Sequence, residues 1–154
     1  MTEVTKDPPM ASGRAMGLDV GSRRIGVALS DPTRTIAQPF GVVDGRRSDA
    51  ACRELCAIAR EHEVGIIIVG LPLQMNGREG TQARVVRRFV DVLRKMLDAE
   101  VQIELWDERL TSRQAERALQ EGGVGSRKAR TVVDQIAASI ILGSYLAARR
   151  SAFS

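Results

Sequence analysis

The spacing of apolar residues along the chain predicts a five-stranded sheet with helices on both faces. Short apolar runs bounded by turn residues predict strands at residues 14–20, 24–30, 40–43, 65–69 and 101–106. Apolar residues that recur every three or four positions predict helices at residues 48–63, 78–97, 111–120 and 126–150. The first two strands form a hairpin and the later strands alternate with helices, so we expect a mixed sheet.

Composition indicates a soluble, cytoplasmic protein. The 154 residues fit one domain, and 44% hydrophobic and 27% charged residues are ordinary for a globular chain. We expect a single domain over residues 14–150 after a disordered tail over residues 1–13. This tail contains acids and prolines where a signal peptide would have an apolar centre. The longest uncharged stretches are shorter than the roughly 20 residues that span a membrane, so no membrane partner is expected.

The two cysteines, Cys52 and Cys56, lie four residues apart on a predicted helix. That spacing separates Cβ atoms by about 5–6 Å, more than a disulfide prefers, so the two should not bridge each other. Two reduced thiols are the simpler interpretation for a cytoplasmic protein. The chain is expected to be a monomer or a homodimer. A sharper hypothesis places Cys56 toward solvent at a dimer surface, where oxidation would link two subunits.

Three acidic residues stand in positions where a carboxylate is costly. Asp19 ends an apolar run before a glycine turn, Glu108 follows the last predicted strand, and Asp134 interrupts the last helix. Taken singly, Asp19 is explained equally well as an ordinary turn residue or as a functional residue. Glu108 is likewise explained equally well by a surface ion pair or by a functional role. Only Arg130, one helical turn away, is a ready partner for Asp134. If the three acids converge, their oxygens suit a hard divalent cation.

Four motifs, in order along the chain, carry a resemblance to a known family. They lie at residues 17–28 (GLDVGSRRIGVA), 69–77 (VGLPLQMNG), 107–112 (DERLTS) and 128–138 (KARTVVDQIAA). With these motifs the chain resembles the YqgF/RuvX family of Holliday junction resolvases, which are also described as pre-16S rRNA nucleases. The resemblance implies an RNase H-like α/β fold, with a five-stranded mixed sheet in strand order 3-2-1-4-5 and helices on both faces.

The same resemblance implies a metal-dependent endonuclease that hydrolyses phosphodiester bonds. Asp19, Glu108 and Asp134 would be its catalytic residues and would bind two Mg²⁺ or Mn²⁺ ions, which activate a water and stabilise the leaving oxygen. The substrate would be nucleic acid, either the 5′ end of pre-16S rRNA or branched DNA such as a Holliday junction. No protein nucleophile is needed, and the single histidine, His62, falls on the core face of its predicted helix.

The Asp-Glu-Arg motif contains two acids, Asp107 and Glu108, that strand alternation places on opposite faces of the sheet. Both faces are expected to be covered, so alternation does not decide which acid reaches the site. Glu108 follows from the resemblance. Asp107 remains a candidate for a residue that supports the metal ligands from behind.

Basic residues near the acids are candidates for binding substrate phosphates. All but three of the 23 basic residues are arginine, which grips phosphate through two-point contacts, although codon bias explains the excess as a whole. A helix N-terminus disfavours cations unless it binds an anion, and a solvated helix start is an equally good interpretation. The candidates are Arg23, Arg24, Arg109, Arg127, Lys128 and Arg130.

Two other functions are compatible with parts of the sequence. The Asp19-Val20-Gly21 turn and the strand after it also resemble the first phosphate loop of actin-like nucleotide-binding proteins. Those proteins repeat the fold twice, whereas this chain has room for one copy, and it lacks a P-loop. The second alternative is a non-catalytic RNA-binding ribosome-assembly factor. Metal-dependent cleavage of nucleic acid would separate a nuclease from both.

Overall fold

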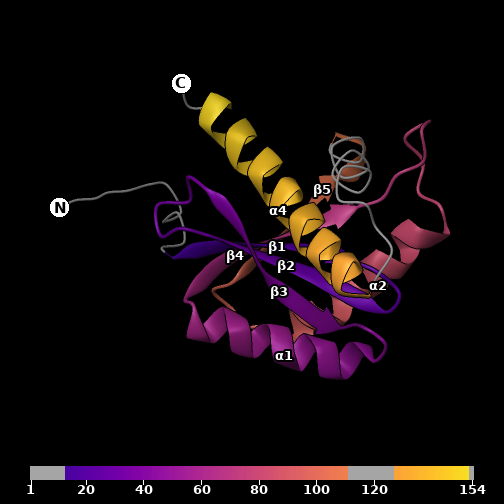
Figure 1. The fold of residues 1–154 in the computed structure, drawn as a ribbon, viewed down its shortest axis with the longest axis horizontal. Helices are drawn as coiled ribbons and strands as arrows, with labels where there is room; N and C mark the ends of the chain where they lie inside the picture. Colours follow the sequence, from indigo (N-terminus) through magenta and orange to yellow (C-terminus); the bar gives the residue numbers. More distant parts are fainter. Residues whose placement is uncertain (1–12, 111–126, 153–154) are drawn as a thin grey trace.

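A mixed sheet of five strands forms the centre of the protein (Figure 1). The computed structural model describes residues 13–110 and 127–152. The strands lie in the order β3-β2-β1-β4-β5, which confirms the expected order. They are β1 (Arg14–Val20), β2 (Arg24–Ser30), β3 (Ala37–Asp44), β4 (Val64–Leu71) and β5 (Gln102–Asp107).

Strand direction divides the sheet into two parts. β1, β2 and β3 pair antiparallel, while β1, β4 and β5 run parallel to one another. Parallel strands present their carboxyl ends at the same edge. The ends of β1, β4 and β5 therefore form one edge, and the segments that follow these strands leave from it.

Helices cover both faces of the sheet (Figure 1). α1 (Ser48–Glu61) and α2 (Thr81–Met96) pack on one face, and α4 (Arg127–Ala152) crosses the other. A 3-10 turn, η1 (Glu108–Leu110), follows β5 directly. The helix predicted over residues 111–120 lies outside the described residues, as do residues 1–12 of the predicted tail.

The two faces of β1 and β2 carry side chains of different size. Large apolar side chains such as Met16 and Leu18 point from β1 toward α1 and α2. On the α4 side, β1 and β2 present small residues, among them Ala15, Gly17 and Ala28. A Cβ added at Gly17 would lie 2.7 Å from the Cβ of Leu142, so α4 lies very close to this part of the sheet.

Two helix ends differ from the prediction for reasons of local backbone geometry. α1 ends at Glu61 rather than at residue 63, because Glu63 has a φ of +55°, in the left-handed region that terminates helices. α2 begins at Thr81 rather than at residue 78, because Leu73 and Glu79 pair in a short antiparallel bridge before it. The spacing of apolar residues reveals neither feature.

Cys56 does not face solvent, which corrects the hypothesis of a Cys56-linked dimer. Cys52 and Cys56 are free thiols on the core side of α1, at 0% and 5% exposure. Burial raises the pKa of both thiols, that of Cys52 to about 11. The buried face of α1 is turned further toward these two positions than predicted, since Ile58 is only partly buried. Cys56 is therefore a core residue, too buried to mark a subunit contact.

One segment of α4, Ala129–Ser151, is long and apolar enough to cross a membrane by length and composition alone. Core helices of soluble proteins pass the same test. Within this segment Ala138, Ile141 and Leu142 pack against the sheet and are exposed by 1% or less. Packing on the sheet accounts for these apolar positions of the helix.

Candidate active site

The shared carboxyl edge of the parallel strands brings two of the predicted acids together. Asp19 is the last residue but one of β1, and Glu108 follows β5 directly. Between them runs β4, where Val69 pairs with Leu18, so that Gly70 stands beside Asp19. Ligands of open α/β sheets bind at this edge, so a functional site is expected here.

Gly70 makes room for Glu108 beside Asp19. A Cβ added at Gly70 would lie 2.9 Å from Oε1 of Glu108 and 3.0 Å from its Cγ. The side chain of Glu108 therefore lies directly against the β4 backbone, one strand away from Asp19. A larger residue at position 70 would push it away.

The carboxyl groups of Asp19 and Glu108 share a hydrogen bond. Burial is the largest cause of a raised pKa in both groups, and the adjacent Asp19 charge also contributes to raising the pKa of Glu108 to about 8. The pKa of Asp19 is raised by burial and by the charge of Asp134, against the lowering effect of the bond with Glu108. Glu108 is therefore protonated at neutral pH, and its O–H donates a hydrogen bond to the Asp19 carboxylate.

Asp107 points away from this pair. Its Oδ2 accepts a hydrogen bond of 2.7 Å from Nη2 of Arg109, and its Oδ1 accepts one of 2.9 Å from the Arg109 backbone N–H. These bonds lower the pKa of Asp107. On β5, Leu105 packs on the α1 and α2 side while Trp106 packs on the α4 side. Alternation thus places Glu108, and not Asp107, on the face that carries Asp19.

Close packing of α4 on β2 brings Asp134 to the same place. Asp19 pairs with Gly26 of β2, and a Cβ added at Gly26 would overlap the backbone carbonyl of Asp134. The helix backbone can reach the strand only because position 26 has no side chain. The glycine at position 26 of β2 therefore sets the position of Asp134 on α4.

Arg24 is the partner of Asp134, which corrects the expectation that Arg130 fills this role. Nε of Arg24 donates to Oδ2 of Asp134 at 2.6 Å, and the two side chains are 34% and 22% exposed. Arg24 lies two residues before Gly26 on β2 and so faces the same side as Asp19. The register of the β1–β2 hairpin places Arg24 on this face, although the sequence alone had indicated only a role in nucleic-acid binding for it.

The acids are compensated by a proton and a guanidinium. Within the described ranges, no three acidic, histidine or cysteine side chains stand close enough together to hold a metal ion as they are. Asp19 and Glu108 are bridged by the Glu108 proton, and Asp134 is held by Arg24. Three carboxylates at one sheet edge are nevertheless the oxygen donors that hard divalent cations prefer. The donor set fits such an ion once the proton and Arg24 give way.

The other residues singled out in the sequence differ in exposure and in their contacts. Arg23 and Arg130 are exposed. Arg127 and Lys128 are the first two residues of α4, and their side chains lie outside the described part of the structure. Arg109 also reaches the β4–α2 loop, where its Nη1 donates to the carbonyl of Met75 at 3.4 Å. His62 is half-buried in edge-to-face contact with Phe40, with ring centroids 5.0 Å apart, in keeping with a structural role.

Solved structures of resolvases share the fold. RuvC of T. thermophilus in complex with a Holliday junction substrate matches with a TM-score of 0.57 at 15% identity, over 90% of this chain and 96% of that one. The fowlpox virus resolvase in complex with Holliday junction DNA matches with a TM-score of 0.53 at 12% identity, over 88% and 97%. Identities this low bear on the fold alone, and they confirm the RNase H-like fold.

Sequence relatives are much more similar. A protein of Chloroflexus aggregans named "Putative pre-16S rRNA nuclease" is 46% identical over 90% of this chain and 96% of its own. Proteins with the same name from Myxococcus xanthus and Streptomyces coelicolor are each 44% identical, over 89% and 93% of this chain and 89% and 85% of their own. The family model RuvX, described as Holliday junction resolvase, matches residues 13–148. This chain therefore belongs to the RuvX family.

Proposed function

We propose that this protein is a metal-dependent endonuclease that cleaves phosphodiester bonds in pre-16S rRNA, in branched DNA, or in both. The hydrogen-bonded pair of Asp19 and Glu108, within electrostatic reach of Asp134, carries the proposal. Acids buried together and shifted in pKa are typical of catalytic sites. The names of the sequence relatives and of the family model support the same chemistry. The compartment of such an enzyme is the cytoplasm.

Asp19, Glu108 and Asp134 are the residues that would hold divalent cations, Mg²⁺ or Mn²⁺. When bound, such ions lower the pKa of an attacking water and stabilise the negative charge on the leaving oxygen. The chain's own contribution is to hold the three carboxylates at one edge of the sheet. Glu108 must give up its proton for this, so the Asp19–Glu108 hydrogen bond belongs to the metal-free state.

Arginine side chains at the rim of the site would bind the substrate phosphates. Arg24 is the nearest to the acids, because it already contacts Asp134. With Asp134 occupied as a metal ligand, the Arg24 guanidinium would be available to a substrate phosphate, two of whose oxygens it can bind with parallel hydrogen bonds. Arg23 and Arg130 are exposed near the same edge and would extend the contact along the backbone.

A cleavage assay on two substrates tests the proposal. A 5′ segment of pre-16S rRNA and a synthetic four-way DNA junction are incubated with the protein and Mg²⁺, Mn²⁺ or EDTA, and the oligomeric state is measured in the same buffer. We expect cleavage of at least one substrate with either metal and none with EDTA. Cleavage of the junction on paired strands requires two sites and therefore a symmetric dimer.

Three outcomes would contradict the proposal. Binding without cleavage at saturating metal would indicate a non-catalytic assembly factor. Turnover of ATP in the absence of nucleic acid would favour the nucleotide-binding alternative. Cleavage that persists in EDTA would rule out the metal-dependent mechanism while keeping the nuclease activity.

A further inference from the structure

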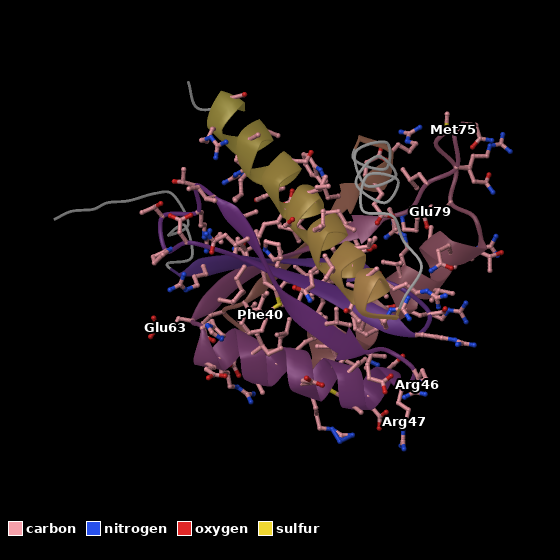
Figure 2. The ribbon with its side chains drawn as sticks, viewed as in Figure 1. Phe40, Arg46, Arg47, Glu63, Met75 and Glu79 are labelled. Atoms are coloured by element: carbon pink, nitrogen blue, oxygen red, sulfur yellow. The ribbon has the colours of Figure 1, made fainter. Side chains whose placement is uncertain are left out.

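Met75 is the most exposed large apolar side chain in the described part of the chain, with 89% of its surface accessible. It lies at the far end of the loop between β4 and α2, and Glu79 of the same loop lies nearer the body of the protein (Figure 2). Single exposed apolar residues are common on protein surfaces. Exposure alone therefore assigns no role to Met75, but the conformation of its loop is also informative.

The tip of the loop is a tight hairpin. Gln74 N–H donates to the carbonyl of Arg78 at 2.9 Å, and Gly77 N–H donates to the carbonyl of Gln74 at 2.8 Å. Oδ1 of Asn76 accepts a further bond of 2.9 Å from Arg78 N–H. Gly77 has a φ of +86°, the left-handed conformation that short hairpins need after the turn. The backbone on both sides of Met75 is thus fixed by hydrogen bonds.

Two arginines fasten the hairpin to the rest of the protein. At its base, Nε of Arg87 on α2 donates to Oε1 of Glu79 at 2.7 Å. At its tip, Arg109 reaches the Met75 carbonyl while it also holds Asp107. Arg109 is the immediate neighbour of Glu108 in the chain. One side chain therefore connects the position of Met75 to the segment that carries a proposed catalytic acid.

We propose that Met75 packs against an unstacked base of the bound substrate. This inference rests on the proposed endonuclease function. A thioether packs well against aromatic rings, and methionine is among the apolar side chains that proteins insert between bases. The chain is poor in aromatics, at 3%, so few aromatic side chains are available to stack on a base. The fixed loop lowers the cost of ordering the side chain on binding.

Fluorescence of 2-aminopurine, which brightens when the base leaves its stack, tests this inference. The probe is placed in a single-stranded pre-16S rRNA segment and at the branch point of a DNA junction. Binding is measured with Asp19→Asn in every protein so that the substrates stay intact, and cleavage is measured without it. Met75→Ala is compared with Met75→Leu, and with Ile36→Ala as a control. Ile36 is 57% exposed and lies after β2, at the opposite edge of the sheet from Asp19.

We expect Met75→Ala to bind about fivefold more weakly, because truncation removes the apolar contact with the base, and to lose the fluorescence rise. Its salt dependence should stay unchanged, because no phosphate contact is removed. Met75→Leu and Ile36→Ala should behave like the parent protein, and the substrate that brightens identifies RNA or branched DNA as the source of the base.

Normal affinity and normal brightening in Met75→Ala, with cleavage of either substrate by the parent protein, would overturn this inference and leave the nuclease proposal intact. Failure of the parent protein both to bind and to cleave either substrate would overturn the two together.

Discussion

Asp19 and Glu108 show how burial beside a second acid changes what a carboxyl group does. An isolated glutamate is charged at neutral pH, whereas Glu108 has a pKa of about 8 because it is buried next to Asp19. The proton it keeps reduces the repulsion within the cluster. The site can therefore exist without a metal at little cost, and it becomes a strong anionic site only when the proton leaves.

Neutralising each acid in turn tests this cluster at the residue scale. Asp19→Asn, Glu108→Gln and Asp134→Asn should each reduce cleavage by more than the roughly 10–100-fold seen when residues behind metal ligands are changed. The melting temperature of Asp19→Asn and Glu108→Gln should stay near that of the parent or rise, because these variants lose repulsion between acids. Asp134→Asn also loses its ion pair with Arg24 and should stay near the parent. Cleavage rates at saturating Mg²⁺ or Mn²⁺ and thermal melts measure the two effects.

A control for these variants is Asp49→Asn, which removes an exposed acid paired with Arg53 on α1 and should cleave normally. Full activity of any one of the three site variants would remove that residue from the site. An inactive Asp107→Asn beside an active Glu108→Gln would exchange the roles of the two neighbours.

The raised pKa of Glu108 predicts how the stability of the metal-free protein depends on pH. The folded protein binds the Glu108 proton more tightly than the unfolded chain, whose glutamate has the ordinary value of 4.5. This contribution to stability is complete below pH 4.5 and is lost as the pH rises through about 8. Melting temperatures in EDTA from pH 5 to 9 should fall more steeply for the parent than for Glu108→Gln. Parallel curves would contradict the shift.

At the scale of single elements, the position of α4 depends on a close approach to β2. Gly26 leaves no side chain between the strand and the Asp134 carbonyl. Helix–sheet contacts usually pass through side chains that can adjust, but backbone against backbone leaves little freedom. The distance between Asp134 and Asp19 is therefore fixed by the fold itself and not by the flexible end of a side chain.

Gly26→Ala should disturb this contact, because the added methyl group would overlap the Asp134 carbonyl. We expect a loss of about 1–3 kcal/mol in the free energy of unfolding, the usual cost of overpacking, and reduced cleavage, since α4 must shift with Asp134. Gly41→Ala on β3 is the matched control, because its added Cβ meets no atom within 4 Å. Denaturant unfolding and cleavage assays compare the two. Equal stability of both variants would show that α4 can shift without cost.

The sequence predicted the elements better than the contacts between them. The strands at residues 14–20 and 24–30 are confirmed with the same bounds, because glycine turns and apolar runs are local features. The partner of Asp134 was missed because Arg24 lies 110 residues away in the chain. Local periodicity also failed for Cys56, since the buried face of α1 depends on where α2 and the sheet stand. The family resemblance predicted that Glu108, and not Asp107, lies beside Asp19. Strand alternation gives the same answer once the two faces of the sheet are known.

For the whole molecule, the placement of basic residues matters more than their sum. The net charge of +4 is modest, so binding of a polyanion depends on local positive potential near the site. Arg23, in the turn after β1, and Arg130, near the start of α4, are both exposed close to the acids. Arginines on the α1 side, such as Arg53 and Arg60, are instead paired with surface acids.

Removing the basic start of α4 should weaken nucleic-acid binding without regard to sequence. In the triple variant of Arg127, Lys128 and Arg130 to Ala, each lost phosphate contact should lower the log–log salt slope by roughly 0.9 on duplex DNA and about 0.7 on single strands. Binding titrations at several salt concentrations measure the slope. A triple variant of Arg46, Arg53 and Arg60 to Ala removes the same charge from the α1 side and should keep the parent slope. Equal slopes in both triple variants would exclude the start of α4 from the interface.

The unequal packing of the two sheet faces lets stability and chemistry evolve separately. The α1 and α2 face holds the larger of the two apolar clusters, and it carries none of Asp19, Glu108 and Asp134. Mutations there can adapt a RuvX protein to heat or cold while the reacting groups keep their places. The α4 face has no such freedom, because its glycines and acids are set by each other. We expect lineages to diverge fastest on the first face and to change the second only in concerted steps.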